Sequence, residues 1–193
     1  PAELLALLDR FLDFSLPAAF SAASLAVALA KRTRFMRDIV ARQLAEEGDA
    51  PGPLTGFYEA FQQFLIGHLT PAAFADLYAQ TITYGLFAAR TRAEAGFSRR
   101  AAFDRIPRTI GVLRDLFRFI SLGDLPAELA WIVDDIAGVL AAADAPGLLA
   151  AYFREGKGSD PIVHFYETFL AQYDPAERER RGVYYTPEAV VSY

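Results

Sequence analysis

Apolar residues recur along most of the chain at intervals of three and four positions, which is the spacing of one face of an α-helix. The pattern is clearest between Pro71 and Gly96, where two neighbouring apolar stripes follow the same stretch. One stripe comprises Phe74, Tyr78, Ile82, Leu86 and Ala89, and the other comprises Leu77, Thr81, Tyr84 and Ala88. A helix with two apolar stripes is buried on two sides, so we predict the central helix of a bundle. We expect Tyr78, Ile82, Leu86 and Phe87 in its core.

Capping residues, prolines and glycines divide the rest of the sequence into further helices. The predicted helices of the bundle cover Pro1–Phe14, Pro17–Glu47, a stretch capped by Thr55 that ends near Gly67, a short stretch capped by Ser98, Pro107–Ile120, Pro126–Leu140, Pro146–Arg154 and Pro161–Tyr173. In the C-terminal segment, a short helix is expected over Ala176–Arg181 and another begins at Pro187. Only Val183–Tyr185 favours an extended backbone. The sequence therefore predicts an all-α fold: a multi-helix bundle of about seven to nine helices, with a short extended segment near the C-terminus.

The composition agrees with a helical fold and excludes several kinds of protein. Alanine and leucine dominate, and the 193 residues include no cysteine, so neither a disulfide framework nor a thiolate metal site is possible. The net charge of −5 argues against nonspecific nucleic-acid binding through bulk charge, although it leaves room for a local basic face.

The most apolar run, Leu16–Ala30, raises the question of a membrane span. It consists mostly of alanine and falls short of the roughly 18 apolar residues that suggest a spanning helix. We therefore expect a buried core helix, no membrane partner and a cytoplasmic location.

Basic residues are concentrated in two places. The helix predicted over Pro17–Glu47 carries Lys31, Arg32, Arg34, Arg37 and Arg42 in its second half. A solvated face with internal ion pairs explains these charges, and a phosphate-binding stripe is the alternative. The densest basic cluster follows the central helix and supplies the candidate DNA contacts, Arg90, Arg92, Arg99 and Arg100. The alternative there is a solvated corner between helices.

We predict no metal site and no catalytic residue in this chain. Asp160, His164 and Glu167 can share one side of a helix, but Asp160 is needed as a cap and no second histidine lies nearby. Asp134 and Asp135 lack further ligands at a suitable spacing. Ser/His/Asp and Cys/His patterns, P-loops and dinucleotide-binding glycine patterns do not occur in the sequence.

Gly156–Ser159 is the best candidate for a domain boundary because it is rich in glycine and short polar residues. It predicts a helical domain over residues 1–158 and a second segment over residues 159–193. In that segment Thr186 and Pro187 signal a helix start, where free backbone N–H groups attract a carboxylate or phosphate. The alternative is that Thr186 only caps its helix and the neighbouring tyrosines are core residues.

The second segment resembles a known family. Asp160-Pro-Ile-Val-His-Phe-Tyr-Glu-Thr-Phe-Leu170, followed by Arg181-Gly-Val-Tyr-Tyr-Thr-Pro-Glu-Ala-Val-Val-Ser-Tyr193, resembles the start of the methyltransferase domain of gamma-class N6-adenine DNA methyltransferases. These enzymes occur in single-chain restriction–modification proteins of types IIG and ISP. The stretch Phe74–Arg90 also resembles the helical segment upstream of that domain.

In that family the Gly-x-Tyr-Tyr-Thr-Pro element, often called motif X, helps to hold S-adenosylmethionine. The resemblance therefore implies that Tyr184, Tyr185, Thr186 and Pro187 contribute to a cofactor site in the parent protein. It also implies that residues 1–158 form a helical spacer or coupler domain. The implied partners are the remainder of the methyltransferase chain and DNA, from which the target adenine is flipped.

The family's glycine-rich cofactor loop and its Asn-Pro-Pro-Tyr-type catalytic tetrapeptide do not occur in this sequence. We therefore expect a fragment of a longer DNA methyltransferase or restriction–modification protein. By itself this fragment should be inactive and should hold no cofactor. The competing hypothesis is a non-catalytic helical module for protein–protein interaction.

Overall fold

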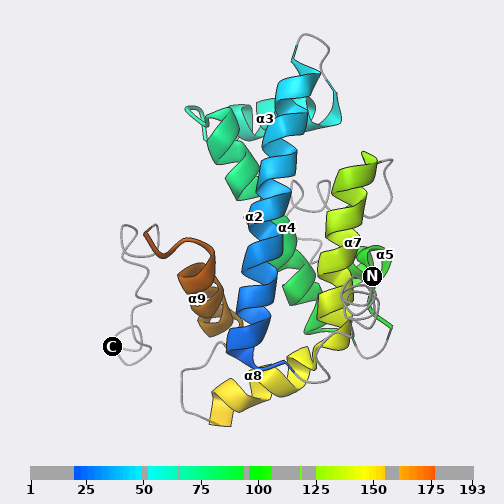
Figure 1. Ribbon diagram of the computed structural model, residues 1–193, viewed down its shortest axis with the longest axis vertical. Coiled ribbons are helices and arrows are strands. Elements are labelled where there is room, and N and C mark those ends of the chain that lie inside the picture. Colours follow the sequence, from blue (N-terminus) through cyan, green and yellow to red (C-terminus); the bar gives the residue numbers. More distant parts are fainter. Residues whose placement is uncertain are drawn as a thin grey trace, which may run out of the picture.

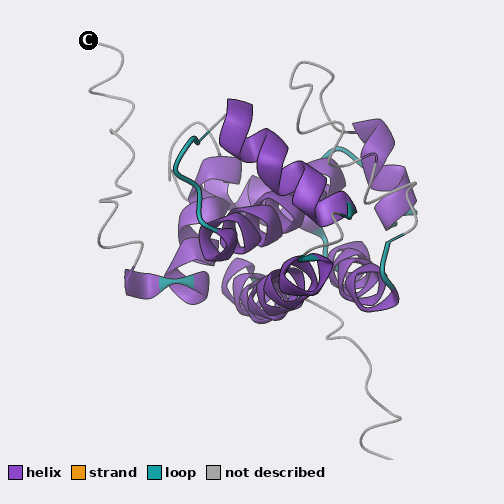
Figure 2. Cartoon of the chain, turned by 90° about the horizontal axis from the view of Figure 1, so that it is seen from above, coloured by secondary structure: helices purple, strands orange, loops and turns teal. Residues whose placement is uncertain are grey.

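The computed structural model describes residues 20–48, 52–64, 66–93, 96–105, 118, 125–154 and 161–176. These residues form seven helices, and no strand is found among them (Figures 1 and 2). The prediction of an all-α bundle is therefore confirmed. The extended segment expected near the C-terminus lies outside the described residues, as do the helix predicted over Pro1–Phe14 and, except for Arg118, the helix predicted over Pro107–Ile120.

The longest helix, α2 (Ala22–Glu47), runs through the length of the bundle and packs against α3, α4, α7 and α9 (Figure 1). It starts later than the predicted Pro17. Ser21 caps it, and a reciprocal pair of hydrogen bonds with Ser24 forms a capping box. It stops at Gly48, as predicted, because Gly48 takes a positive φ of 26° that suits glycine. Four residues of the apolar run, Leu25, Ala26, Leu29 and Ala30, are fully buried.

The predicted central helix is α4 (Pro71–Arg90), and it contacts α2, α3, α5 and α7. Its start is as predicted, since the Thr70 hydroxyl accepts a hydrogen bond from the backbone N–H of Ala73 at 3.2 Å. Its end was predicted near Gly96 but lies at Arg90, because the chain turns at Thr91. Tyr78, Ile82, Leu86 and Phe87 are all fully buried, which confirms the core prediction.

Five shorter helices complete the described fold: α3 (Pro53–Phe64), α5 (Arg99–Arg105), α7 (Ala127–Ala142), α8 (Ala145–Arg154) and α9 (Pro161–Tyr173). In Figure 1, α7 and α9 flank α2 on opposite sides, α3 lies near the end of α2, and α8 lies near its start. Three starts differ from the prediction. Helix α7 begins one residue after the predicted Pro126, and α8 begins one residue before the predicted Pro146. The carboxylate of Asp144, just before α8, accepts a hydrogen bond from the N–H of Gly147 at 3.1 Å.

The start of α3 is the other difference. Thr55 does not cap this helix but lies inside its first turn. The cap is Glu47, the last residue of α2. Its carboxylate accepts hydrogen bonds from the N–H groups of Gly52, Leu54 and Thr55 and from the Thr55 hydroxyl, at 2.7–3.2 Å. An acidic side chain from one helix thus satisfies the free N–H groups of the next.

Helix α9 belongs to the same hydrophobic core as the helices before it. Phe165, Phe169, Leu170 and Tyr173 are buried in that core. The Phe87 and Phe165 rings stack with their centroids 4.0 Å apart. The predicted boundary at residue 158 therefore does not separate two cores, although its role as a functional boundary stays a prediction.

A helix that could span a membrane is not found in the part of the chain that the structure describes, because none combines sufficient length with sufficient apolarity.

Candidate functional site

Arg90, the first of the four candidate DNA contacts, is partly buried against the end of α7. Its guanidinium donates hydrogen bonds to the carbonyl oxygens of Ala93, Leu140 and Ala143, each at 3.0 Å. Leu140 and Ala143 lie at the C-terminal end of α7, a helix with no basic residue in its own last turn. Arg90 therefore supplies the positive charge and the donors that the end of α7 lacks.

The other three candidates lie near α5 and differ in exposure. The Nε of Arg99 lies 2.9 Å from the Oδ1 of Asp134 on α7, and its side chain is largely covered. Arg92 and Arg100 are exposed. Arg105 is also exposed, and its guanidinium donates to the Arg92 carbonyl at 3.2 Å, which ties the end of α5 to the turn after α4. The corner thus offers Arg92, Arg100 and Arg105 to solvent.

The basic residues of α2 mostly serve contacts between helices. Arg32 pairs with Asp135 of α7 at 2.7 Å, and Arg34 donates to the last two carbonyls of α9. Arg42 pairs with Glu128 of α7 and lies 3.8 Å from Glu46. Only Arg37–Asp38 and Arg42–Glu46 are ion pairs within the helix. The expected internal ion pairs are therefore a small part of what these arginines do.

A polar network joins the end of α9 to α4. The Tyr173 hydroxyl donates a hydrogen bond to Asp76, and Gln80 donates to the other carboxylate oxygen of Asp76 at 2.7 Å. Tyr166 extends the network by donating to Gln80 at 3.5 Å. Burial, followed by the hydrogen bond to Asp76, raises the pKa of Tyr173 far above its ordinary value of 10.0. Tyr173 is therefore a hydrogen-bond donor throughout the physiological pH range.

The four residues expected to contact S-adenosylmethionine, Tyr184, Tyr185, Thr186 and Pro187, lie outside the described residues. His164, considered above as a metal ligand, lies 3.6 Å from Glu167 on the same helix. Within the described ranges, no cluster of His, Asp and Glu side chains could hold a metal ion.

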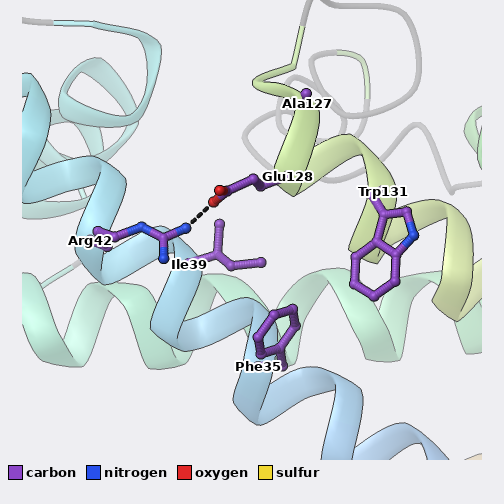
Figure 3. A pocket seen from close by; sticks show the side chains of 6 residues that line it. All are labelled: Phe35, Ile39, Arg42, Ala127, Glu128 and Trp131. Carbon is purple, nitrogen blue, oxygen red and sulfur yellow. Dashed lines mark hydrogen bonds and ion pairs between the residues drawn. The ribbon is translucent and has the colours of Figure 1, made fainter.

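A groove between α2 and α7 is a second candidate site (Figure 3). It has a volume of about 360 Å³ and is lined by Phe35, Ile39, Arg42, Ala127, Glu128 and Trp131. The rings of Phe35 and Trp131 meet edge to face with centroids 6.1 Å apart, yet they are 50% and 60% exposed. The Arg42–Glu128 ion pair closes one end. Large aromatic side chains left in solvent at a groove are typical of a surface that binds another apolar group.

Comparisons with protein-family models, with curated proteins and with solved structures find no match to this chain.

The groove and the three capping roles of Glu47, Arg34 and Arg90 were not predicted from the sequence. The groove forms where two aromatic residues on different helices meet, and these residues lie far apart in the sequence. Helical spacing alone therefore does not show that they are neighbours. The capping roles left a weak signal: α7 and α9 have no basic residue in their last turns, and α3 has no acidic residue in its first turn. Such helices need charged partners from elsewhere.

Proposed function

We propose that this chain is the helical spacer or coupler region, with the first segment of the catalytic domain, of an S-adenosylmethionine-dependent N6-adenine DNA methyltransferase of a restriction–modification system. The observation that carries the proposal is the Gly182-Val-Tyr-Tyr-Thr-Pro187 element shortly after the aromatic helix α9. The packing of α9 supports a coupling role, because the helix that leads to this element is part of the bundle core.

The proposal assigns the cofactor to the parent protein. S-adenosylmethionine would supply the methyl group, and Tyr184, Tyr185, Thr186 and Pro187 would contribute one edge of its pocket. The catalytic residues would come from parts of the protein outside this sequence, since its residues include no catalytic tetrapeptide of the family. Cytoplasmic location is part of the same proposal.

DNA contact in this proposal falls to the exposed side chains at the corner of α4 and α5. Among the described residues, the exposed side chains of Arg92 and Arg100 make none of the interhelical bonds that engage Arg90 and Arg99. Their guanidinium groups can bind phosphate oxygens without breaking contacts that hold the bundle together. We therefore assign backbone contacts to Arg92 and Arg100, with Arg105 beside them, and structural roles to Arg90 and Arg99.

The test is a methyl-transfer assay on the full polypeptide of the natural reading frame. Radiolabelled S-adenosylmethionine and duplex DNA are supplied, and the DNA is digested to nucleosides. We expect label in N6-methyladenine, and no transfer by the 193-residue chain alone. A full polypeptide that is folded but neither binds the cofactor nor labels DNA would contradict the proposal.

The groove favours the second candidate function, a non-catalytic interaction module. Under that hypothesis the full polypeptide has no affinity for S-adenosylmethionine, and Phe35 and Trp131 anchor a partner protein in the groove between α2 and α7. Changing both residues to serine would then abolish the partner complex while methyl transfer remains absent. The same assay therefore separates the two candidates.

A further inference from the structure

We propose that Arg34, Asp76 and Tyr173 form a latch that fixes the C-terminal turn of α9 against α2 and α4. In the parent protein this latch would couple the bundle to the segment that carries Tyr184–Pro187. The second statement rests on the proposed function, whereas the first concerns only the described helices. We call these three residues the α9 latch.

Arg34 holds the latch from the side of α2. Its guanidinium donates to the carbonyl oxygen of Gln172 at 2.8 Å and to that of Tyr173 at 3.0 Å. These carbonyls belong to the last turn of α9, where the helix offers no N–H partners. Because α9 has no basic residue in its own last turn, the cation that complements its negative end comes from α2.

Tyr173 and Asp76 hold the same turn from the side of α4. Tyr173 is 4% exposed, and its ring stacks on Phe169 with centroids 5.4 Å apart. Its hydroxyl reaches Asp76, whose other carboxylate oxygen is held by Gln80. Tyr173 is thus fixed by its main chain to α2 and by its side chain to α4.

The latch acts on the last turn of α9. Asp174 donates its backbone N–H to Leu170 at 2.9 Å and follows Tyr173 directly. Side chains of α2 and α4 therefore both form hydrogen bonds with the final residues of α9, just before Pro175. Apolar packing determines which face of α9 meets the core. It does not by itself determine how far the helix is shifted along its own axis, because the same face can be buried at several such positions. Hydrogen bonds to the terminal carbonyls and to the tyrosine hydroxyl allow only one position, since they are directional.

The chain provides a matched control at the other end of α9. The Tyr84 hydroxyl donates to the carbonyl oxygen of Ile162 at 2.7 Å, in the first turn of the helix. Tyr84→Phe and Tyr173→Phe each remove one tyrosine hydroxyl that bonds α9 to a neighbour. Only Tyr173→Phe opens the latch.

The experiment measures hydrogen–deuterium exchange in the full natural polypeptide, together with its affinity for S-adenosylmethionine. We expect Arg34→Ala and Tyr173→Phe to speed exchange of the amides around residues 171–174 by about tenfold, the effect of one lost hydrogen bond on local opening. Arg34→Lys should restore part of the protection, and Tyr84→Phe should leave these amides unchanged. Cofactor affinity should fall several-fold in the latch variants and stay constant in Tyr84→Phe.

Each outcome decides one part of the inference. Unchanged exchange at residues 171–174, or an equal change in Tyr84→Phe, would show that these residues only contribute to packing, and the latch would be wrong. Faster exchange with unchanged cofactor affinity would overturn the coupling. If the wild-type polypeptide binds no S-adenosylmethionine, the proposed function fails, and the exchange measurement still decides whether the latch exists.

Discussion

The guanidinium of Arg90 donates a hydrogen bond to the carbonyl oxygen of Leu140, 3.0 Å away, near the end of the neighbouring helix α7. Arg34 does the same for α9, and the carboxylate of Glu47 serves the start of α3. Charged side chains at three helix termini therefore come from other helices. Charged side chains that the sequence suggests as ligand-binding residues can therefore stabilise the ends of helices instead.

Arg90→Ala should lower the free energy of unfolding by about 2 kcal/mol, because three partly buried carbonyls lose a charged donor. Urea unfolding at neutral pH measures the change. Arg100→Ala is the control, since this exposed side chain should alter stability by no more than about 0.5 kcal/mol. Equal effects of the two substitutions would show that the interhelical bonds of Arg90 contribute nothing.

Glu47→Gln should lower the free energy of unfolding by about 1 kcal/mol near neutral pH, which is the usual contribution of a helix cap. Burial alone would raise the pKa of Glu47, but the hydrogen bonds from Thr55, Leu54 and Gly52 outweigh it and lower the pKa below 4.5. A carboxylate with a lowered folded-state pKa stabilises the fold above pH 4.5, and this contribution is lost as the pH falls through the folded-state pKa.

The difference in stability between wild type and Glu47→Gln should therefore shrink below about pH 4.5. Urea unfolding across a pH series measures it. Glu46→Gln is the matched control, because that neighbouring side chain is 68% exposed and lies 3.8 Å from Arg42. A difference that grows as the pH falls would contradict the assigned role of Glu47.

Tyr78→Phe should leave the free energy of unfolding unchanged or raise it by up to about 1 kcal/mol. Tyr78 is fully buried, burial raises its pKa well above 10.0, and its hydroxyl has no hydrogen-bond partner among the described residues. Tyr58→Phe should instead lower the free energy of unfolding by about 1 kcal/mol, since the Tyr58 hydroxyl donates to the Leu69 carbonyl at 2.9 Å. Thermal or urea unfolding of the two variants compares them. An equal loss in both would show that the Tyr78 hydroxyl is also paired.

Thr33 and Thr83 should show a coupling energy of about 1 kcal/mol in a double-mutant cycle with valine. Their hydroxyls lie 2.9 Å apart in the core between α2 and α4, and Thr33 also donates to the Leu29 carbonyl at 2.8 Å. Thr33→Val should be the costlier single change, because it leaves the Thr83 hydroxyl buried without its acceptor. Strictly additive effects in urea unfolding would contradict a direct bond between the two residues.

The sequence predicted the helices well where local signals and burial agree. Thr70 with Pro71 marks the start of α4, Gly48 ends α2, and the apolar stripe through Tyr78 and Ile82 is the core. It failed at Thr55, where Glu47 provides a better acceptor, and at the end of α4, where no residue between Arg90 and Gly96 signals a stop. Local helix propensity carries no information about hydrogen-bond partners that other helices supply.

The candidate sites were less predictable than the fold. Arg90 and Arg100 look alike in the sequence, and only the position of α7 separates an interhelical cap from an exposed charge. Phe35 and Trp131 look like ordinary core residues at helical spacing, yet both face solvent at the groove. The motif at Tyr184–Pro187 remains a prediction from resemblance.

The affinity of the full natural polypeptide for S-adenosylmethionine, measured by titration calorimetry, tests the proposed function most directly. We expect Tyr185→Ala and Thr186→Ala each to weaken binding by roughly 1–2 kcal/mol, the scale of one lost hydrogen bond or packed contact. Lys31→Ala, an exposed change on α2, should leave the affinity unchanged. Wild-type affinity in both tail variants, with the fold intact, would contradict the methyltransferase assignment and favour the interaction module.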